Sequence, residues 1–78
     1  MKFYGYQEDS DQLEKLEEVT FECSIEELEK IIAFLAVVKK EHEKINGETE
    51  YCHSHYKDWD KKCMSTSPDL IIVTKFGP

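Results

Sequence analysis

The most regular stretch of the chain is SIEELEKIIAFLAVVKKEHEKI, residues 24–45. Its apolar residues recur every three or four positions, which predicts an amphipathic helix. We expect this helix to be the centre of the fold. The predicted apolar stripe consists of Leu28, Ile31, Ile32, Leu35, Val38, His42 and Ile45, widened by Phe34 and Val37.

Both ends of this helix carry sequence signals. Ser24 and Glu27 have the spacing of a capping box, in which each side chain accepts a backbone N–H of the other residue. Glutamates occupy the first turns and lysines the last, which is the order that the helix macrodipole favours. Asn46 and Gly47 follow, and a glycine at this point commonly ends a helix in the left-handed conformation.

Residues 18–23, EVTFEC, predict a half-buried strand in front of the helix. Their alternation places Val19, Phe21 and Cys23 on one face and polar residues on the other. The run LIIV within residues 69–76 is apolar on both faces, as in a strand covered on two sides. Residues 2–7 and 48–57 are two further candidate strands, with β-compatible aromatic residues.

Residues 8–16 and 58–68 are predicted to be polar connections, so the expected order is β-β-α-β-β. We expect one α+β domain over residues 1–78, a two-layer sandwich with one long helix packed on a four-stranded sheet. The third strand is expected to run parallel to the second, because the helix between them returns the chain.

One helix covers one face of such a sheet and leaves the other face open. Tyr4 and Tyr6 alternate with Phe3, and Ile71 and Val73 alternate with their neighbours, so apolar groups project from both faces. An exposed apolar patch of this kind indicates an interface with a second copy or with another protein. The alternative is that tyrosine, being amphipathic, tolerates half-exposure without a partner.

The charge is strongly negative and unevenly distributed. Lysine accounts for all ten basic residues, against seventeen acidic ones, and the net charge is −7. Residues 8–29 contain ten acidic residues and one base, Lys15, so this segment carries −9. A chain without arginine and with this charge is a poor binder of nucleic acid or anionic membrane.

The same negative field attracts a basic protein. The alternative is that the acidic residues only keep a small domain soluble. The expected partner-binding residues are Glu14, Glu17, Glu18, Glu22, Tyr4, Tyr6 and Trp59. Trp59 lies in the polar run of residues 56–62, where it either folds back as a lid on the core or stands out as a binding anchor. We favour the lid, because a small domain rarely leaves so large a ring without contacts.

His53 and His55 are two residues apart in a predicted strand, so both imidazoles point to one face and are candidate zinc ligands. The alternative is that they are structural and bond to neighbouring acids, since the chain lacks the paired C-x-x-C spacing of structural zinc sites. Further candidate ligands within range are Cys52, Cys63, Asp58, Asp60 and His42.

An enzymatic function is not expected. The odd number of cysteines indicates free thiols, and acidic surroundings disfavour the thiolate that a nucleophilic cysteine needs. Glycine occurs at positions 5, 47 and 77, which excludes a glycine-rich phosphate loop. No apolar run is long enough to cross a bilayer and the N-terminus lacks the core of a signal peptide, so we expect a cytoplasmic protein without a cofactor.

Three segments in this order resemble small single-domain bacterial immunity proteins of polymorphic toxin systems. They are residues 16–24 leading into 26–28 and 32–35, residues 53–59 with the sequence HSHYKDW, and residues 68–73 with the sequence PDLIIV. The resemblance implies a non-enzymatic protein that binds and neutralises a partner toxin inside the producing cell. A small zinc-binding protein and a structural homodimer are the alternatives.

Overall fold

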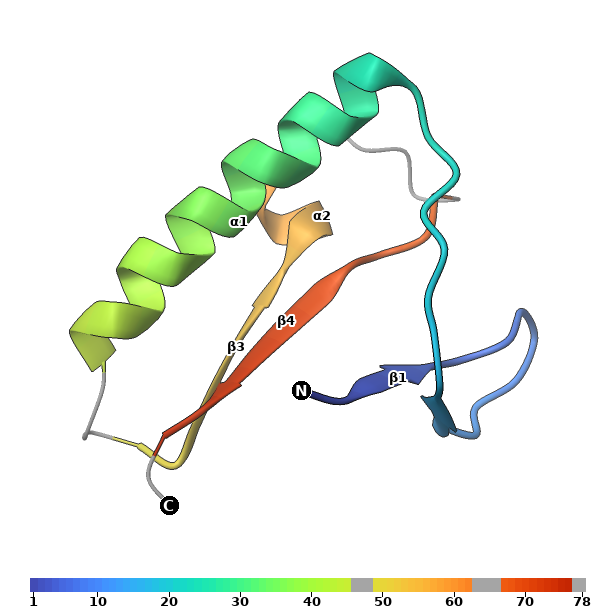
Figure 1. Ribbon diagram of the computed structural model, residues 1–78, viewed down its shortest axis with the longest axis horizontal. Helices are drawn as coiled ribbons and strands as arrows, with labels where there is room; N and C mark the ends of the chain where they lie inside the picture. Colours follow the sequence, from blue (N-terminus) through green and yellow to red (C-terminus); the bar gives the residue numbers. More distant parts are fainter. Residues whose placement is uncertain (46–48, 63–66, 77–78) are drawn as a thin grey trace.

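A computed structural model describes residues 1–45, 49–62 and 67–76. Its elements form two separate two-stranded antiparallel sheets, β1–β2 and β3–β4, with the long helix α1 beside the second (Figure 1). The protein is therefore α+β. In chain order the elements are β1 (Phe3–Gly5), β2 (Glu14–Leu16), α1 (Ile25–Ile45), β3 (Tyr51–His55), α2 (Tyr56–Trp59) and β4 (Ile71–Lys75).

The predicted four-stranded sheet is wrong. Helix α1 covers a ribbon of two strands, β3 and β4, whereas the β1–β2 hairpin forms a sheet of its own on the far side of β4 from the helix in this view (Figure 1). Because the second and third strands belong to different sheets, the parallel relation expected between them does not exist. The two-layer sandwich is reduced to one helix on one narrow ribbon.

The predicted strand at residues 18–23 is also wrong. Strand β2 forms earlier, at Glu14–Leu16, within a stretch expected to be a polar connection. A turn brings the chain back at this point: Ser10 N–H donates to the Gln7 carbonyl over 3.1 Å, and Asp9 adopts a left-handed φ of 61°. This early reversal pairs β1 with residues 14–16 and leaves residues 18–23 without a neighbouring strand.

The side chains of residues 18–23 are consequently exposed. Phe21 keeps 51% of its surface accessible, and Cys23, which was expected to face the core, is exposed as well. Alternation shows which face of a strand is apolar, but the strand forms only beside an edge that accepts its hydrogen bonds. In the described part of the chain no strand pairs with residues 18–23.

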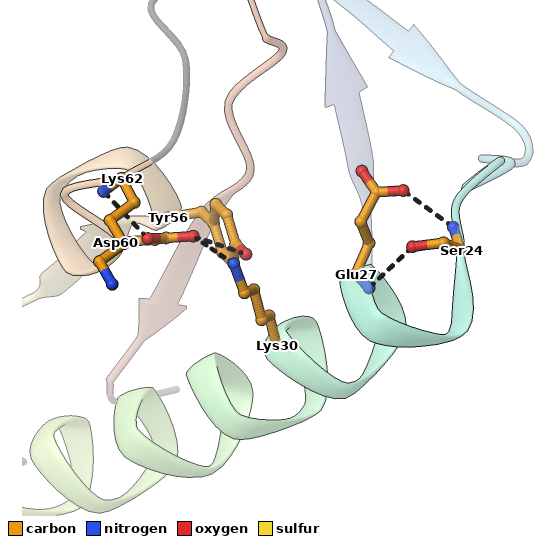
Figure 2. Close-up of polar contacts among 6 residues, drawn as sticks. All are labelled: Ser24, Glu27, Lys30, Tyr56, Asp60 and Lys62. Carbon is orange, nitrogen blue, oxygen red and sulfur yellow. Dashed lines mark hydrogen bonds and ion pairs between the residues drawn. The ribbon is translucent and has the colours of Figure 1, made fainter.

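The predicted helix is confirmed over Ile25–Ile45, together with its capping box. Glu27 N–H donates to Ser24 Oγ over 3.1 Å, and Ser24 N–H donates to Glu27 Oε1 over 2.8 Å (Figure 2). These hydrogen bonds from the backbone and the hydroxyl of Ser24 hold the pKa of the Glu27 carboxyl below its usual value. The helix end expected at residues 46–47 lies outside the described residues.

Strands β3 and β4 lie within the predicted segments 48–57 and 69–76, apart from residue 48, which is outside the described residues. They pair antiparallel with His53 opposite Val73. The connection predicted at residues 58–68 is partly wrong, because the helical turn α2 includes Asp58 and Trp59. Residues 63–66 of that connection are outside the described residues.

The core lies between α1 and the ribbon, and it is small. Phe34 and Val38 are buried, at 1% and 4% exposed. The remaining apolar positions of the stripe extend beyond the two strands, so Leu35 and Ile32 are largely exposed. The predicted stripe was wide enough for a four-stranded sheet, and a ribbon of half that width covers only its middle.

His42 connects the helix to both strands. Its Nδ1 lies 2.7 Å from Thr74 Oγ1 on β4, and its Nε2 lies 2.9 Å from Ser54 Oγ on β3. The side chain is 4% exposed. A neutral imidazole has one donor and one acceptor, and each hydroxyl supplies either role, so both ring nitrogens are satisfied in a site with almost no water.

We expect His42→Ala to lower the free energy of unfolding by about 2–4 kcal/mol, because it opens a cavity and leaves two hydroxyls without their partner. Urea denaturation followed by circular dichroism measures the change. The control is His53→Ala on the outer face of β3, where the side chain is exposed and the expected change is below about 0.5 kcal/mol.

A triple variant separates the hydrogen bonds from the packing. His42→Leu alone leaves the Ser54 and Thr74 hydroxyls without their hydrogen-bond partner. Adding Ser54→Ala and Thr74→Val removes both hydroxyls, and we expect this triple variant to regain part of the stability that His42→Leu loses. If His42→Ala costs no more than His53→Ala, then the contact of His42 with the two strands does not hold the helix in place.

Candidate protein-binding surface

We call residues 8–29 the acidic segment. It runs from the β1–β2 loop through β2 and the connection after it to the first turns of α1 (Figure 1). All ten of its acidic residues are exposed. The ion pairs joining described lysines to acids, Lys30 with Asp60 and Lys39 with Glu43, lie outside it. Its charge of −9 therefore faces solvent along its whole length.

Apolar side chains are interleaved with these carboxylates. Val19, Phe21 and Ile25 are 44%, 51% and 71% exposed, between Glu17, Glu18 and Glu22 on one side and the glutamates of α1 on the other. Isolated exposed apolar residues are ordinary in a protein surface, but a run of them inside one charged segment makes a mixed surface. Such a surface offers a partner both charged groups and apolar side chains that would lose their water on binding.

The β1–β2 hairpin adds two aromatic side chains. Tyr4 lies opposite Lys15 in the register, and Glu14 lies opposite Gly5, so these residues occupy one small sheet. Tyr4 and Tyr6 are both more than half exposed. Of the predicted partner-binding residues, the structure thus places Tyr4, Tyr6 and Glu14 in the hairpin, and the other three glutamates follow directly in the connection to α1.

Trp59 lies elsewhere, at the end of α2. Its ring is 5.7 Å from the ring of Phe34 and 5.7 Å from that of Tyr56, and the Phe34 and Tyr56 rings are 5.3 Å apart. Trp59 keeps 38% of its surface exposed. Its position agrees with a lid over the fully buried Phe34, and it is not part of the surface formed by the acidic segment.

Asp60 fastens this aromatic cluster to α1. One carboxylate oxygen is 3.6 Å from Lys30 Nζ and accepts from the Tyr56 hydroxyl over 3.3 Å, while the other accepts from Lys62 N–H over 3.1 Å (Figure 2). Asp60 was considered as a metal ligand from sequence. In the structure its carboxylate is occupied by these three donors, which hold α2 against the helix.

The two histidines of the HSH segment share one face of β3, with ring centroids 5.5 Å apart. Cys52 is on the opposite face, as alternation requires, and both nitrogens of His42 are used by Ser54 and Thr74. Cys63 lies outside the described residues. Within the part of the chain that the structure describes, no three His, Cys, Asp or Glu side chains come together in a metal-binding group.

His55 bonds instead to Asp69, a residue that the sequence did not single out. His55 Nδ1–H donates to Asp69 Oδ2 over 2.8 Å, and Asp69 Oδ1 accepts from the backbone N–H groups of Lys57 and Leu70 over 3.0 and 2.9 Å. Partial burial opposes ionisation of Asp69, but the hydrogen bonds from Lys57, His55 and Leu70 outweigh it and hold its pKa below the usual value.

A His–Asp pair also orients the general base of many hydrolytic sites, and a groove lies beside this pair. The groove has a volume of 460 Å³ and runs between α1 and β3. Ser54 is the one hydroxyl or thiol residue of its lining, and that hydroxyl is bonded to His42. Through its three hydrogen bonds the pair joins β3 and α2 to the start of β4.

The sequence around Asp69 contains a turn signal that indicates its backbone contacts. It follows Ser67 and Pro68 and precedes the apolar run of β4, and Ser-Pro-Asp clusters mark turns in which the aspartate bonds to nearby backbone N–H groups. His42 had a sequence signal too, since a histidine at a stripe position must find polar partners on the opposing element. Ser54 and Thr74 are the hydroxyl residues on the inner face of the ribbon.

Comparisons with known proteins supply no relative: no protein-family model, curated protein or solved structure matches the chain. In the described ranges, neither helix combines the length and the apolar content that a membrane crossing requires.

The lowered pKa of Asp69 makes stability depend on pH. A carboxyl with a lower pKa in the folded state contributes stability that is present above its unfolded pKa and is lost as pH falls through the folded value. We expect the stability difference between the wild type and Asp69→Asn to be constant above about pH 5 and to shrink below about pH 4.

Urea denaturation from about pH 3 to about pH 7 measures this difference. Asp58→Asn, a matched change at an exposed aspartate of α2, is the control and should change the free energy of unfolding by less than about 0.5 kcal/mol. A pH-independent difference for Asp69→Asn would contradict the role assigned to its hydrogen bonds.

Proposed function

We propose that this protein is a non-enzymatic binding module that inhibits a basic protein partner, in the manner of a bacterial immunity protein that neutralises a toxin. The observation that carries the proposal is the exposure of the acidic segment over its whole length, with a charge of −9 and apolar side chains between the carboxylates. The role proposed here places the protein in the cytoplasm of the producing cell.

The charge favours a fast encounter with a basic protein. Complementary potentials raise association rates well above the neutral value and disfavour acidic competitors. The rest of the chain carries +2, so the negative field is concentrated on the acidic segment. A basic partner would therefore be drawn to this segment and not to the whole surface equally.

The apolar residues supply the contact that charge alone does not. Exposed surface charges contribute little to affinity one at a time, whereas buried aromatic anchors carry much of the binding energy in protein interfaces. Tyr4 and Tyr6 on the hairpin and Phe21 in the connection are exposed aromatic side chains in or next to the acidic segment. Glu14, Glu17, Glu18 and Glu22 surround them.

The resemblance to immunity proteins supports the same reading. It rests on residues 16–24, 26–28, 32–35, 53–59 and 68–73, and the first two of these ranges lie within the acidic segment. A toxin that acts on nucleic acid is a basic protein, because it must bind phosphates with lysine and arginine. An acidic inhibitor complements such a surface.

The test uses the protein encoded beside this one as the probe, co-expressed and purified, with polylysine as a probe of charge alone. We expect the triple change Glu17→Lys, Glu18→Lys and Glu22→Lys to weaken binding at least tenfold and to flatten its dependence on salt. Isothermal titration calorimetry between about 50 and 300 mM salt measures both effects.

The control is the triple change Glu41→Lys, Glu43→Lys and Glu50→Lys, which alters the net charge equally at exposed sites outside the acidic segment. The affinity of this control variant for the probe protein should stay within about threefold of the wild-type affinity, after correction for the change in net charge. An unchanged affinity in the first variant, or wild-type binding no tighter than that of polylysine, would refute the proposal.

A further inference from the structure

The chain exposes more surface than a compact monomer of its size. Its accessible surface is 7046 Å² for a mass of 9.2 kDa, whereas a folded monomer of that mass exposes about 4,900 Å². The radius of gyration is 13.7 Å, against about 11.5 Å for a compact chain of this length. The excess of roughly 2,100 Å² is within the range that one partner buries in an obligate interface.

Strand β4 has an unpaired edge. Tyr56 N–H donates to the Leu70 carbonyl and Phe76 N–H donates to the Glu50 carbonyl, so residues 70, 72, 74 and 76 direct their backbone groups toward β3. By alternation, the N–H and C=O groups of Ile71, Val73 and Lys75 point away from β3. No described strand pairs with them, because this sheet contains two strands.

A groove lies along this edge, between β4 and α1. It has a volume of 430 Å³, and apolar side chains form much of it, including Leu35, Val38, Ile72 and Phe76. Lys39, Lys75 and Glu43 also line it, so its charge is positive. The corresponding groove beside β3 contains Glu41 and Asp58 and no lysine, which makes it a poor site for an acidic segment.

Residues 18–23 have the pattern that this edge and groove require. Val19, Phe21 and Cys23 form an apolar face with a period of two, and Glu18, Thr20 and Glu22 form a polar face. The segment is nevertheless outside any strand in the described structure, with Val19 and Phe21 largely exposed. Residues 18–23 thus have a strand pattern but pair with no described strand, and β4 has an edge that pairs with no described strand.

We propose that residues 18–23 of one copy pair antiparallel with β4 of a second copy, and that the exchange is reciprocal, giving a closed two-fold dimer. The occupant is a second copy because, in its own chain, the segment is held between the β1–β2 hairpin and the capped start of α1 and pairs with no described strand. A reciprocal exchange uses the same contact twice and closes without further copies.

The pattern selects one register. Phe21 opposite Ile72 places the apolar face toward α1 and into the groove, and it sets Thr20 opposite Val73 and Glu18 opposite Lys75. The hydrogen bonds then join Glu18, Thr20 and Glu22 to the free backbone groups of β4. Shifting the pairing by one residue would turn the apolar face away from the groove. A shift by two residues would keep that face inward but would separate Glu18 from Lys75, so this charge pair selects the register among those that the alternation allows.

This dimer does not rest on the proposed function, but it changes which residues stay open to a basic partner. Pairing buries Val19 and Phe21 and leaves Glu18 and Glu22 on the outer face of the ribbon, so Tyr4 and Tyr6 are the aromatic side chains that remain exposed for that partner in the dimer. The two associations respond to salt in opposite directions. Two copies of charge −7 repel each other and associate more tightly as salt rises, whereas a complex with a basic partner weakens.

Disulfide cross-linking tests the contact. Two proteins are prepared with the native cysteines replaced by serine, one carrying Thr20→Cys and the other Val73→Cys, and their mixture is oxidised. Residues opposite each other in an antiparallel pair are about 4.5–5.5 Å apart at Cα, which suits a disulfide. We expect a mixed disulfide dimer in high yield, identified by peptide mass, and at least tenfold less with Phe21→Cys in place of Thr20→Cys.

Equal yields for the Thr20→Cys and Phe21→Cys proteins would overturn the proposed register. A single chain carrying both Thr20→Cys and Val73→Cys distinguishes exchange from closure within one chain. The exchanged dimer predicts covalent dimers of this variant at low concentration, whereas a cross-linked monomer would overturn the proposal by showing that the segment binds its own β4.

Sedimentation of the unmodified protein gives a second readout. We expect a dimer at micromolar concentration that dissociates in Phe21→Glu and in Val73→Pro, the latter lacking the N–H that points away from β3. Tyr6→Glu, a matched change at an exposed aromatic outside residues 18–23, should remain dimeric. A wild type that is monomeric at about 100 µM, far above the dissociation constant of an obligate interface, would overturn the proposal.

Discussion

The contact of His42 with Ser54 and Thr74 is the interaction on which the rest of the structure depends. A single imidazole ties the helix to both strands of the ribbon, at distances of 2.9 and 2.7 Å. It does so in a core whose buried apolar members are Phe34 and Val38 within the described residues. Because so few side chains are buried, apolar contact alone fixes the position of α1 on the ribbon weakly, and hydrogen bonds to two different strands supply the missing specificity.

Two further polar contacts extend this arrangement to one end of the ribbon, where β3 runs into α2 and β4 begins. Asp60 joins the aromatic cluster of α2 to Lys30 on the helix, and Asp69 joins His55 to the backbone at the start of β4. Each contact fastens a short element that has too little apolar surface to be held by packing. The protein therefore compensates for a small core with polar contacts at defined points, while the acidic segment stays exposed and no described strand pairs with the outer edges of the ribbon.

The chemistry of the surface is more informative about function than any enclosed site. Both grooves are open. The surface has two other features: a long run of exposed carboxylates with apolar residues between them, and a strand edge on β4 that no described strand pairs with. These are features by which proteins bind proteins, through charge complementarity in the first case and strand addition in the second.

The sequence by itself determined the helix from Ile25 to Ile45, its capping by Ser24 and Glu27, and the charge of the acidic segment, because each depends on residues close together in the chain. It also indicated the strands near Tyr51–His55 and Ile71–Lys75 from their composition. Only the tertiary structure decided which strands pair, since residues 18–23 have a strand pattern but β1 is paired with Glu14–Leu16 instead. It likewise decided the partners of His42 and His55, because those hydroxyl and carboxylate groups lie 12 to 32 residues away in the chain and meet the rings only after folding.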